Sequence, residues 1–204
     1  METRDRQAHW GAVYTSKDET AVSWFQENPE TSLRLIEGCS RPGANVVDVG
    51  AGASRLIDHL VDRGYRVTAL DIARAALDKT RARLGHRASE VNWIAADVTG
   101  WCPPELFDVW HDRAVFHFLT DERDRLAYAG VLAAAVRTGG WAVIGTFAPD
   151  GPERCSDLPV CRYDARSLAG VFARDFTLVD ELAEGHLTPS GKTQRFQFSV
   201  LRRL

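Results

Sequence analysis

The 204-residue sequence has no long apolar run, no excess of basic charge and no closely spaced pair of cysteines. Its longest apolar stretches fall far short of the ~20 residues that cross a bilayer, so no membrane partner is predicted. The formal net charge is −3, which gives no general attraction to a phosphate backbone and disfavours nucleic acid as a partner. Five basic residues between positions 74 and 87 do not share one helical face, and acids surround them. They indicate a solvated helix rather than an RNA-binding strip.

The cysteines and the N-terminal residues indicate the cellular compartment. Four cysteines, at positions 39, 102, 155 and 161, form no C-x-x-C pair and no zinc-finger spacing, so no metal site is predicted. The first residues, Met1-Glu2-Thr3-Arg4, lack the apolar core of a signal peptide. Both observations predict a cytoplasmic protein with reduced thiols. The length and the hydrophobic share of 45% are those of one globular domain.

Two phosphate-binding motifs are also missing. A G-x-G-x-x-G fingerprint starting at Gly50 would need glycine at position 55, where the chain has Arg55, and no G-x-x-x-x-G-K-[ST] loop occurs. The run Val46–Gly52 nevertheless has the form of an apolar strand and a glycine turn, and the next apolar strand ends in Asp71. Glycines let the backbone approach a ligand closely, and an acid at the following strand end can bind ribose hydroxyls. The pattern indicates an adenosine without phosphates, and Asp48 places a carboxylate beside a cationic amino-acid group. S-adenosylmethionine fits both.

The same motifs resemble those of class I S-adenosylmethionine-dependent methyltransferases. The matches occur in the family's order over roughly half of the chain: Asp48–Gly52, Asp71, Ala96–Val98, Phe107–Asp112 and Arg137–Trp141. The resemblance implies S-adenosylmethionine as cofactor and S-adenosylhomocysteine as product. It implies cofactor contacts from Asp48, Gly50, Ala51, Gly52, Asp71, Ile72, Asp97 and Val98. A nicotinamide-dependent oxidoreductase is the alternative that Arg55 disfavours.

Apolar and helical patterns alternate along the chain, which predicts a mostly parallel sheet covered on both faces. The expected strands are 45–49, 65–70, 91–95, 107–111, 141–147, 176–181 and 194–201. The expected helices are 31–38, 54–63, 73–84, about 121–136, and a short one from 164 or 167. We therefore predict a Rossmann-like, doubly wound, seven-stranded sheet that ends in an antiparallel hairpin. The whole chain, 1–204, is predicted to be one domain with an N-terminal arm and helix (1–40), a cofactor-binding core (45–147) and a substrate-side loop and hairpin (148–204).

The segment after the fourth strand carries the candidate catalytic residues. Asp112 can hold a cationic substrate or the methionine end of the cofactor, and His111 or His117 can take a proton. The Asp-Arg-Ala step beginning at Asp112 resembles thiopurine-type small-molecule methyltransferases, and loosely an Asp-Lys-Gly step of protein-lysine methyltransferases. The alternative is that Asp112 and Arg113 pair with each other or with nearby charges and only shape the loop.

Aromatic residues near the N-terminus indicate a lid. In thiopurine-like and tellurite-resistance-like methyltransferases a leading Trp and a second aromatic motif close over the cofactor, and Trp10 and Trp24 correspond to them. Such a lid excludes water and can stabilise a sulfonium by cation–π contact. Alternatively, these aromatics only pin the arm to the sheet.

Candidate acceptor contacts lie in several segments. We predict them at Trp24, Phe25, Arg113, Arg154, Tyr163 and His186. Cys155 and Cys161 raise the alternative of a thiol-bound metalloid, as in arsenite methylation, although buried free cysteines are commonly small hydrophobes. The stretch around His186 can equally be an exposed hairpin turn.

The sequence thus predicts a metal-independent methyltransferase that acts on a small molecule, with a thiol or another soft nucleophile favoured, by in-line displacement. The alternatives are a protein-lysine methyltransferase and, behind it, a cofactor-binding partner subunit without catalysis. The sequence does not decide the oligomeric state, and it allows a monomer.

Overall fold

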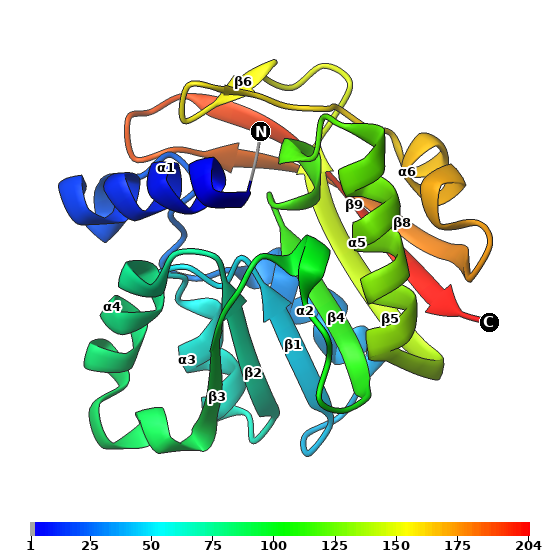
Figure 1. Cartoon of the computed structure of the whole chain (residues 1–204), viewed down its shortest axis with the longest axis horizontal. Coiled ribbons are helices and arrows are strands. Elements are labelled where there is room, and N and C mark those ends of the chain that lie inside the picture. The colour runs from blue at the N-terminus through cyan, green and yellow to red at the C-terminus, as the bar shows by residue number, and fades with distance from the viewer. Residues whose placement is uncertain (1–2) are drawn as a thin grey trace.

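A computed structural model describes residues 3–204, so the first two residues of the predicted arm, Met1 and Glu2, lie outside the described residues. Seven strands form one sheet in the order β3-β2-β1-β4-β5-β9-β8 (Figure 1). Their bounds are β1 (Asn45–Val49), β2 (Arg66–Asp71), β3 (Val91–Ala95), β4 (Phe107–Arg113), β5 (Val136–Phe147), β8 (Phe176–Leu187) and β9 (Thr193–Arg203). The first five strands are parallel, whereas β9 runs antiparallel to β5 and β8. Strand order reverses between β1 and β4, and such a switch point opens a crevice at the carboxyl ends of the strands.

Helices cover both faces of this sheet. They are α1 (Thr3–Ser16), α2 (Glu30–Cys39), α3 (Leu56–Asp62), α4 (Arg74–Leu84), α5 (Glu122–Ala135) and α6 (Ala165–Phe172). Four 3-10 turns add η1 (Glu19–Ala21), η2 (Gly85–Glu90), η3 (Val98–Gly100) and η4 (Phe116–Phe118). Asp121 begins α5 by accepting a hydrogen bond from the Arg123 amide, and Asp164 and Ser167 form a capping box on α6. Short polar side chains at these positions satisfy amides that have no partner inside the helix.

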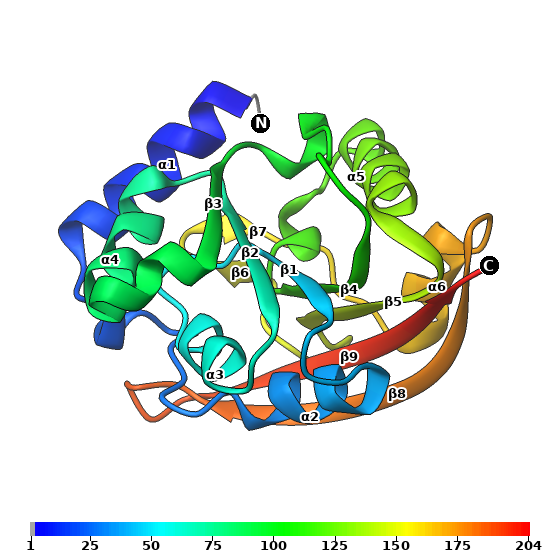
Figure 2. The ribbon, with the colours of Figure 1, turned by 90° about the horizontal axis from the view of Figure 1, so that it is seen from below.

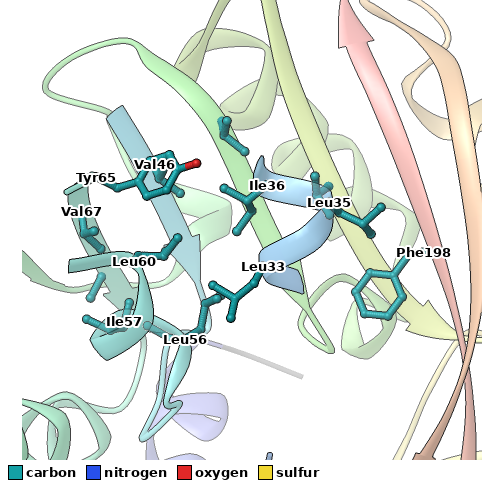
Figure 3. Packing of buried hydrophobic residues seen from close by; sticks show 14 of the residues in the cluster. Leu33, Leu35, Ile36, Val46, Leu56, Ile57, Leu60, Tyr65, Val67 and Phe198 are labelled. Carbon is teal, nitrogen blue, oxygen red and sulfur yellow. The ribbon is translucent and has the colours of Figure 1, made fainter. Parts of the chain in front are cut away.

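The core has two main layers, one on each side of the sheet. Val46 packs with α2 and α3 on one face, whereas Val47 packs with α5 and α6 on the other. Figure 2 shows α2 and α3 together on one side of the sheet and α5 on the opposite side, and Figure 3 shows Leu33 and Ile36 of α2 beside Val46. Because successive side chains of a strand point to opposite faces, a strand buried on both sides reads as a continuous apolar run.

The predicted Rossmann-like fold with its terminal hairpin is confirmed, with local differences. β5 begins at Val136, so the predicted loop around Gly139 and Gly140 is part of the strand. The final hairpin is longer than predicted because β8 and β9 pair as far as Leu187 and Thr193. The predicted loop after β5 contains a two-stranded ribbon, β6 (Arg154–Cys155) and β7 (Leu158–Pro159).

Helix α1 was not predicted, because its residues form no apolar stripe. The buried residues of α1 are Arg6 and Tyr14, one charged and one amphipathic. A hydropathy pattern does not mark such a face. None of the helices within residues 3–204 combines the length and the apolar character needed to cross a membrane.

Candidate active site

The carboxyl ends of the parallel strands open into a cavity of about 100 Å³. One part of its lining follows β1, β2 and β3, and another follows β4 and includes Cys155 of β6. Helix α1 contributes a third wall. The lining residues are Arg6, Trp10, Tyr14, Trp24, Val49, Gly50, Leu70, Asp71, Ile72, Ala96, Asp97, Val98, Arg113, Ala114, Val115, Phe118 and Cys155.

The glycine turn after β1 is packed too tightly for any other residue. Gly50 and Gly52 have φ of 69° and 50°, in the left-handed region that glycine adopts without steric cost. A Cβ on Gly50 would clash with the Val115 side chain, and one on Gly52 would clash with the Tyr14 hydroxyl. The Gly50 amide donates to the Leu70 carbonyl at 2.8 Å, which ties the turn to β2. The turn therefore brings bare backbone to the cavity wall.

Asp71 is fixed at the end of β2 by two backbone amides. Its Oδ2 accepts from Gly52 at 2.9 Å and its Oδ1 accepts from Ala73 at 2.7 Å. Each carboxylate oxygen keeps further acceptor capacity on the cavity side, as a pair of ribose hydroxyls requires. Burial raises the pKa of Asp71 to about 6, although the two amide hydrogen bonds oppose that rise. The site thus fits the ribose of an adenosine cofactor while Asp71 is ionised.

This pKa predicts a pH dependence of cofactor affinity. Hydrogen bonds from ribose hydroxyls are strongest to the ionised carboxylate, so affinity should be constant above pH 7 and fall as Asp71 is protonated below about pH 6. Calorimetric titration with S-adenosylhomocysteine between pH 5 and 8 measures it. Asp71→Asn should bind more weakly, with a flat profile over that range. An equally steep fall in Asp71→Asn would show that another group titrates.

Asp97, the predicted adenine contact, has protein partners as well. It begins η3 by accepting from the Thr99 amide at 3.0 Å, so the helix-cap interpretation of this residue also holds. Its Oδ2 accepts from Thr3 and from Arg6, each at 2.7 Å. Burial opposes ionisation, but these hydrogen bonds lower the pKa of Asp97. The carboxylate is therefore charged and anchors helix α1 at the cavity edge.

Helix α1 closes the cavity with residues spaced four apart. Arg6, Trp10 and Tyr14 lie on one helical face, and all three line the cavity. Arg6 also pairs with Asp124 of α5 at 2.6 Å. The Trp10 ring meets the Trp24 ring edge to face at 5.8 Å. The aromatics thus wall the cavity, as a lid requires, and also pack against one another, as an anchor requires.

A second, smaller cavity of about 50 Å³ shares Tyr14 and Trp24 with the first as lining residues. A buried chain of hydrogen bonds lies at its wall. His111 Nδ1 is 2.6 Å from Asp48 Oδ1, and His111 Nε2 is 2.9 Å from Ser32 Oγ. Both contacts are satisfied when Nδ1 donates to the carboxylate and Nε2 accepts from the hydroxyl. Asp48 keeps its second oxygen for a cationic group, as expected at the methionine end of the cofactor.

A family model described as a methyltransferase domain matches residues 46–140, which include the glycine turn, Asp71 and Asp97. Residues 46–140 of the chain form a methyltransferase domain of the class I S-adenosylmethionine-dependent type. This match confirms the predicted family resemblance and supports S-adenosylmethionine as the cofactor.

Individual relatives differ in what they act on. Nodulation protein S of Rhizobium tropici is 27% identical over 122 residues, which cover 60% of this chain and 51% of that protein. The eEF1A lysine and N-terminal methyltransferase of Mus musculus is 25% identical over 119 residues, 57% of this chain and 17% of that one. The 1,6-didemethyltoxoflavin-N1-methyltransferase of Burkholderia thailandensis was solved with bound 1,6-didemethyltoxoflavin and S-adenosylhomocysteine. It superposes with a TM-score of 0.75 at 23% identity, covering 100% of this chain and 91% of that chain. The chain spans about half the length of the nodulation proteins that it matches.

The structure brings most of the predicted cofactor residues together at the two cavities. Ala51 joins Asp48 and Gly50 at the smaller one, and Ile72 and Val98 join Asp71 at the larger one. Of the predicted acceptor and catalytic residues, Trp24, Phe25, Arg113 and His111 line at least one cavity.

Five of the predicted acceptor and catalytic residues line neither cavity, and neither does Gly52 of the predicted cofactor residues. Asp112 is fully buried and accepts from the Val115 and Phe116 amides and the Tyr128 hydroxyl, so it shapes the loop without pairing with Arg113. His117 is fully buried, and burial lowers its pKa to about 3, which leaves the imidazole neutral. Tyr163 packs in the core. His186 donates to the Ser23 carbonyl, and Arg154 donates to the Asp157 carbonyl. For these five, a role at the reacting atoms stays a prediction that the geometry does not favour.

Several lining residues were not predicted as ligand contacts: Arg6, Tyr14, Ser32, Val115 and Phe118. The four-residue spacing of Arg6, Trp10 and Tyr14 was the available signal, because it places one charged and two aromatic residues on one face of a helix. Ser32 had none, since its role depends on a contact with His111, which lies 79 positions away in the sequence.

The lid interpretation predicts a specific effect of Trp24→Ala. Losing one aromatic wall should weaken S-adenosylhomocysteine binding about tenfold, because aromatic contacts contribute about 0.5–1.5 kcal/mol each. The melting temperature should stay within about 3 °C, because Trp24 is only partly buried. Trp141→Ala is a matched control: Trp141 lies within β5, stacks on Arg202 and lines neither cavity, so binding should be unchanged. A large loss of stability with normal binding would support the anchoring interpretation instead.

Proposed function

We propose that this chain transfers the methyl group of S-adenosylmethionine to a small-molecule acceptor, with a thiolate or another soft nucleophile favoured. One observation carries the proposal. The larger cavity has the strand-end acids Asp71 and Asp97 at one part and Arg113 and Cys155 at another, so nucleoside and acceptor can share it. The cofactor supplies an activated methyl group, and the residues of the chain have to align the acceptor and exclude water. Positioning of this kind can lower a barrier by about 7–11 kcal/mol.

The ionisable groups around the acceptor part favour an acceptor that ionises by itself. Burial lowers the pKa of Arg113 to about 10 and raises the pKa of Cys155 to about 11, so neither is a base at neutral pH. Hydroxyl acceptors need a positioned base, whereas a thiolate needs none. A buried guanidinium also lowers the pKa of a thiol beside it. The lining thus supports a soft, anionic nucleophile.

The covering helix supports a small acceptor. Arg6, Trp10 and Tyr14 of α1 lie across the larger cavity, and Arg6 is held by two carboxylates at 2.6 and 2.7 Å. A polypeptide would have to displace this helix, whereas a small molecule needs only the space beneath it. Methylation of a protein lysine is the alternative, because the murine relative modifies a protein.

Product formation tests the proposal. The full chain is incubated with S-adenosylmethionine carrying a deuterated methyl group and with a panel of small thiols, amines and hydroxyl compounds. Mass spectrometry then follows the labelled product and S-adenosylhomocysteine. We expect turnover with at least one thiol and none with histone or elongation-factor peptides. Turnover with lysine peptides alone would favour the alternative, and cofactor binding without any turnover would favour a non-catalytic subunit. Cytoplasmic location, independence of metals, lack of a nucleic-acid partner and membership of the thiopurine-like branch stay predictions.

A further inference from the structure

Arg113 is a buried cation at the junction of the two cavities. It ends β4, and its side chain lines both cavities while being only 10% exposed. Its Nη1 donates to the Trp24 carbonyl at 3.0 Å, and its guanidinium lies over the Phe196 ring at 4.5 Å. These contacts orient the planar group but leave most of its hydrogen-bonding capacity unused.

The remaining donors of Arg113 are unsatisfied. Nε and Nη2 have no hydrogen-bond partner among residues 3–204, and neither has Oε2 of Glu184. Glu184 Oε2 is 3.8 Å from Nη2, too far for a hydrogen bond, while Gln26 donates to the other Glu184 oxygen at 3.3 Å. The buried Arg6 and the partly buried Arg83 differ from Arg113, because the closest carboxylate oxygen lies 2.6 Å from each of them.

Arg113 has one carboxylate nearby, that of Glu184, but makes no hydrogen bond to it. Burial lowers its pKa to about 10, and the charge of Glu184 opposes that effect, so the guanidinium stays charged at neutral pH. The titratable groups that face it from other elements are Glu184 and His186 of β8, His117 of η4 and Cys155 of β6. Of these, Glu184 alone carries a carboxyl group. A buried donor without an acceptor is costly, and a planar guanidinium pairs best with a carboxylate.

We propose that Arg113 forms a binding site for a carboxylate group of the acceptor, which would make the substrate a small organic acid. The inference rests on the proposed function, since it assigns the substrate class of the same cavity. An acceptor carboxylate would supply the hydrogen bonds that Nε and Nη2 lack. Glu184 would then limit the affinity for the acceptor, because it holds a second negative charge beside this carboxylate-binding site.

The methionine carboxylate of the cofactor is a second source of the same chemistry. Asp48 and the glycine turn lie along β1, whereas the Arg113 side chain reaches toward β8 and β9, where it meets Glu184 and Phe196. This direction favours the acceptor. The two sources are separated by comparing S-adenosylhomocysteine with 5′-methylthioadenosine, which lacks the amino-acid carboxylate.

The test is a set of calorimetric titrations on the full chain and on the variants Arg113→Met and Glu184→Gln. Each protein is titrated with the two nucleosides and then, loaded with S-adenosylhomocysteine, with benzoate and with its neutral counterpart benzamide. For each nucleoside, we expect the same affinity in all three proteins. Benzoate should bind the loaded wild type and should fail to bind Arg113→Met, because its carboxylate pairs with the guanidinium. It should bind Glu184→Gln about tenfold more tightly, because that variant lacks the negative charge that competes for Arg113. Benzamide should bind none of them.

Three outcomes would overturn the inference. Arg113→Met could lose affinity for S-adenosylhomocysteine but not for 5′-methylthioadenosine, which would show that Arg113 binds the carboxylate of the cofactor. Benzoate could bind all three proteins equally, or it could bind neither the wild type nor Glu184→Gln. If Arg113→Met fails to fold, the tighter binding expected of Glu184→Gln decides alone. Failure of the wild type to bind S-adenosylhomocysteine would instead contradict the proposed function itself.

Discussion

Replacing Asp71 by alanine is expected to weaken the affinity for S-adenosylhomocysteine by at least tenfold. Two charge-assisted hydrogen bonds to ribose hydroxyls are lost, each contributing about 1.5–3 kcal/mol, and about 1.4 kcal/mol corresponds to a factor of ten. The substitution also removes the acceptor of the Gly52 and Ala73 amides, so the glycine turn loses a support. Calorimetric titration at pH 8, where Asp71 is ionised in the wild type, measures the effect.

The matched control for this prediction is Asp78→Ala. Asp78 is an exposed acid on α4, the helix that follows Asp71, and it lines neither cavity. Its removal should leave the dissociation constant unchanged. If Asp71→Ala binds the nucleoside as tightly as Asp78→Ala does, Asp71 does not contact the ribose.

Replacing Asp112 by alanine should destabilise the fold by about 3 kcal/mol, since three buried donors lose their acceptor and each costs about 1–3 kcal/mol. These donors are the Val115 and Phe116 amides and the Tyr128 hydroxyl, at 2.9, 3.0 and 2.6 Å. A loss of that size lowers the melting temperature of a chain of this length by about 10 °C. Differential scanning calorimetry measures it.

The pH dependence of this loss gives a second check. Burial raises the pKa of Asp112 from 3.8 to about 6 in the folded protein, so ionisation costs stability as the pH rises from about 4 to 6. The variant should therefore be more strongly destabilised at pH 5 than at pH 8. Tyr128→Phe removes one donor and should cost less than Asp112→Ala. A melting temperature of Asp112→Ala equal to that of the wild type would show that the loop does not depend on this carboxylate.

The cofactor half of the site was predictable because its signals are local in the sequence. A strand, a glycine turn and a strand-end acid are read within about 25 residues, from Val46 to Asp71. The order of strands in a doubly wound sheet then brings Asp48, Asp71 and Asp97 to one crevice without further information. Residues in these positions can be named before their side-chain contacts are known.

The rest of the site depends on long-range contacts that no local pattern encodes. Asp112 and His117 were predicted at the reacting centre because they follow the expected strand 107–111, yet both are fully buried and line neither cavity. Whether a side chain after a strand faces the cavity or the core is decided by the local chain path, here a turn in which Ala114 has a φ of 70°. The ion pairs that fix α1 likewise join residues about 90 or more positions apart.

The most direct test of the central claim is calorimetric titration of the purified chain with S-adenosylmethionine, with NAD as the control ligand. A glycine turn without a third glycine, an ionised Asp71 and an aromatic lid predict micromolar binding of S-adenosylmethionine and no binding of NAD. Binding of NAD in place of S-adenosylmethionine, or of neither ligand, would contradict the account of this cavity.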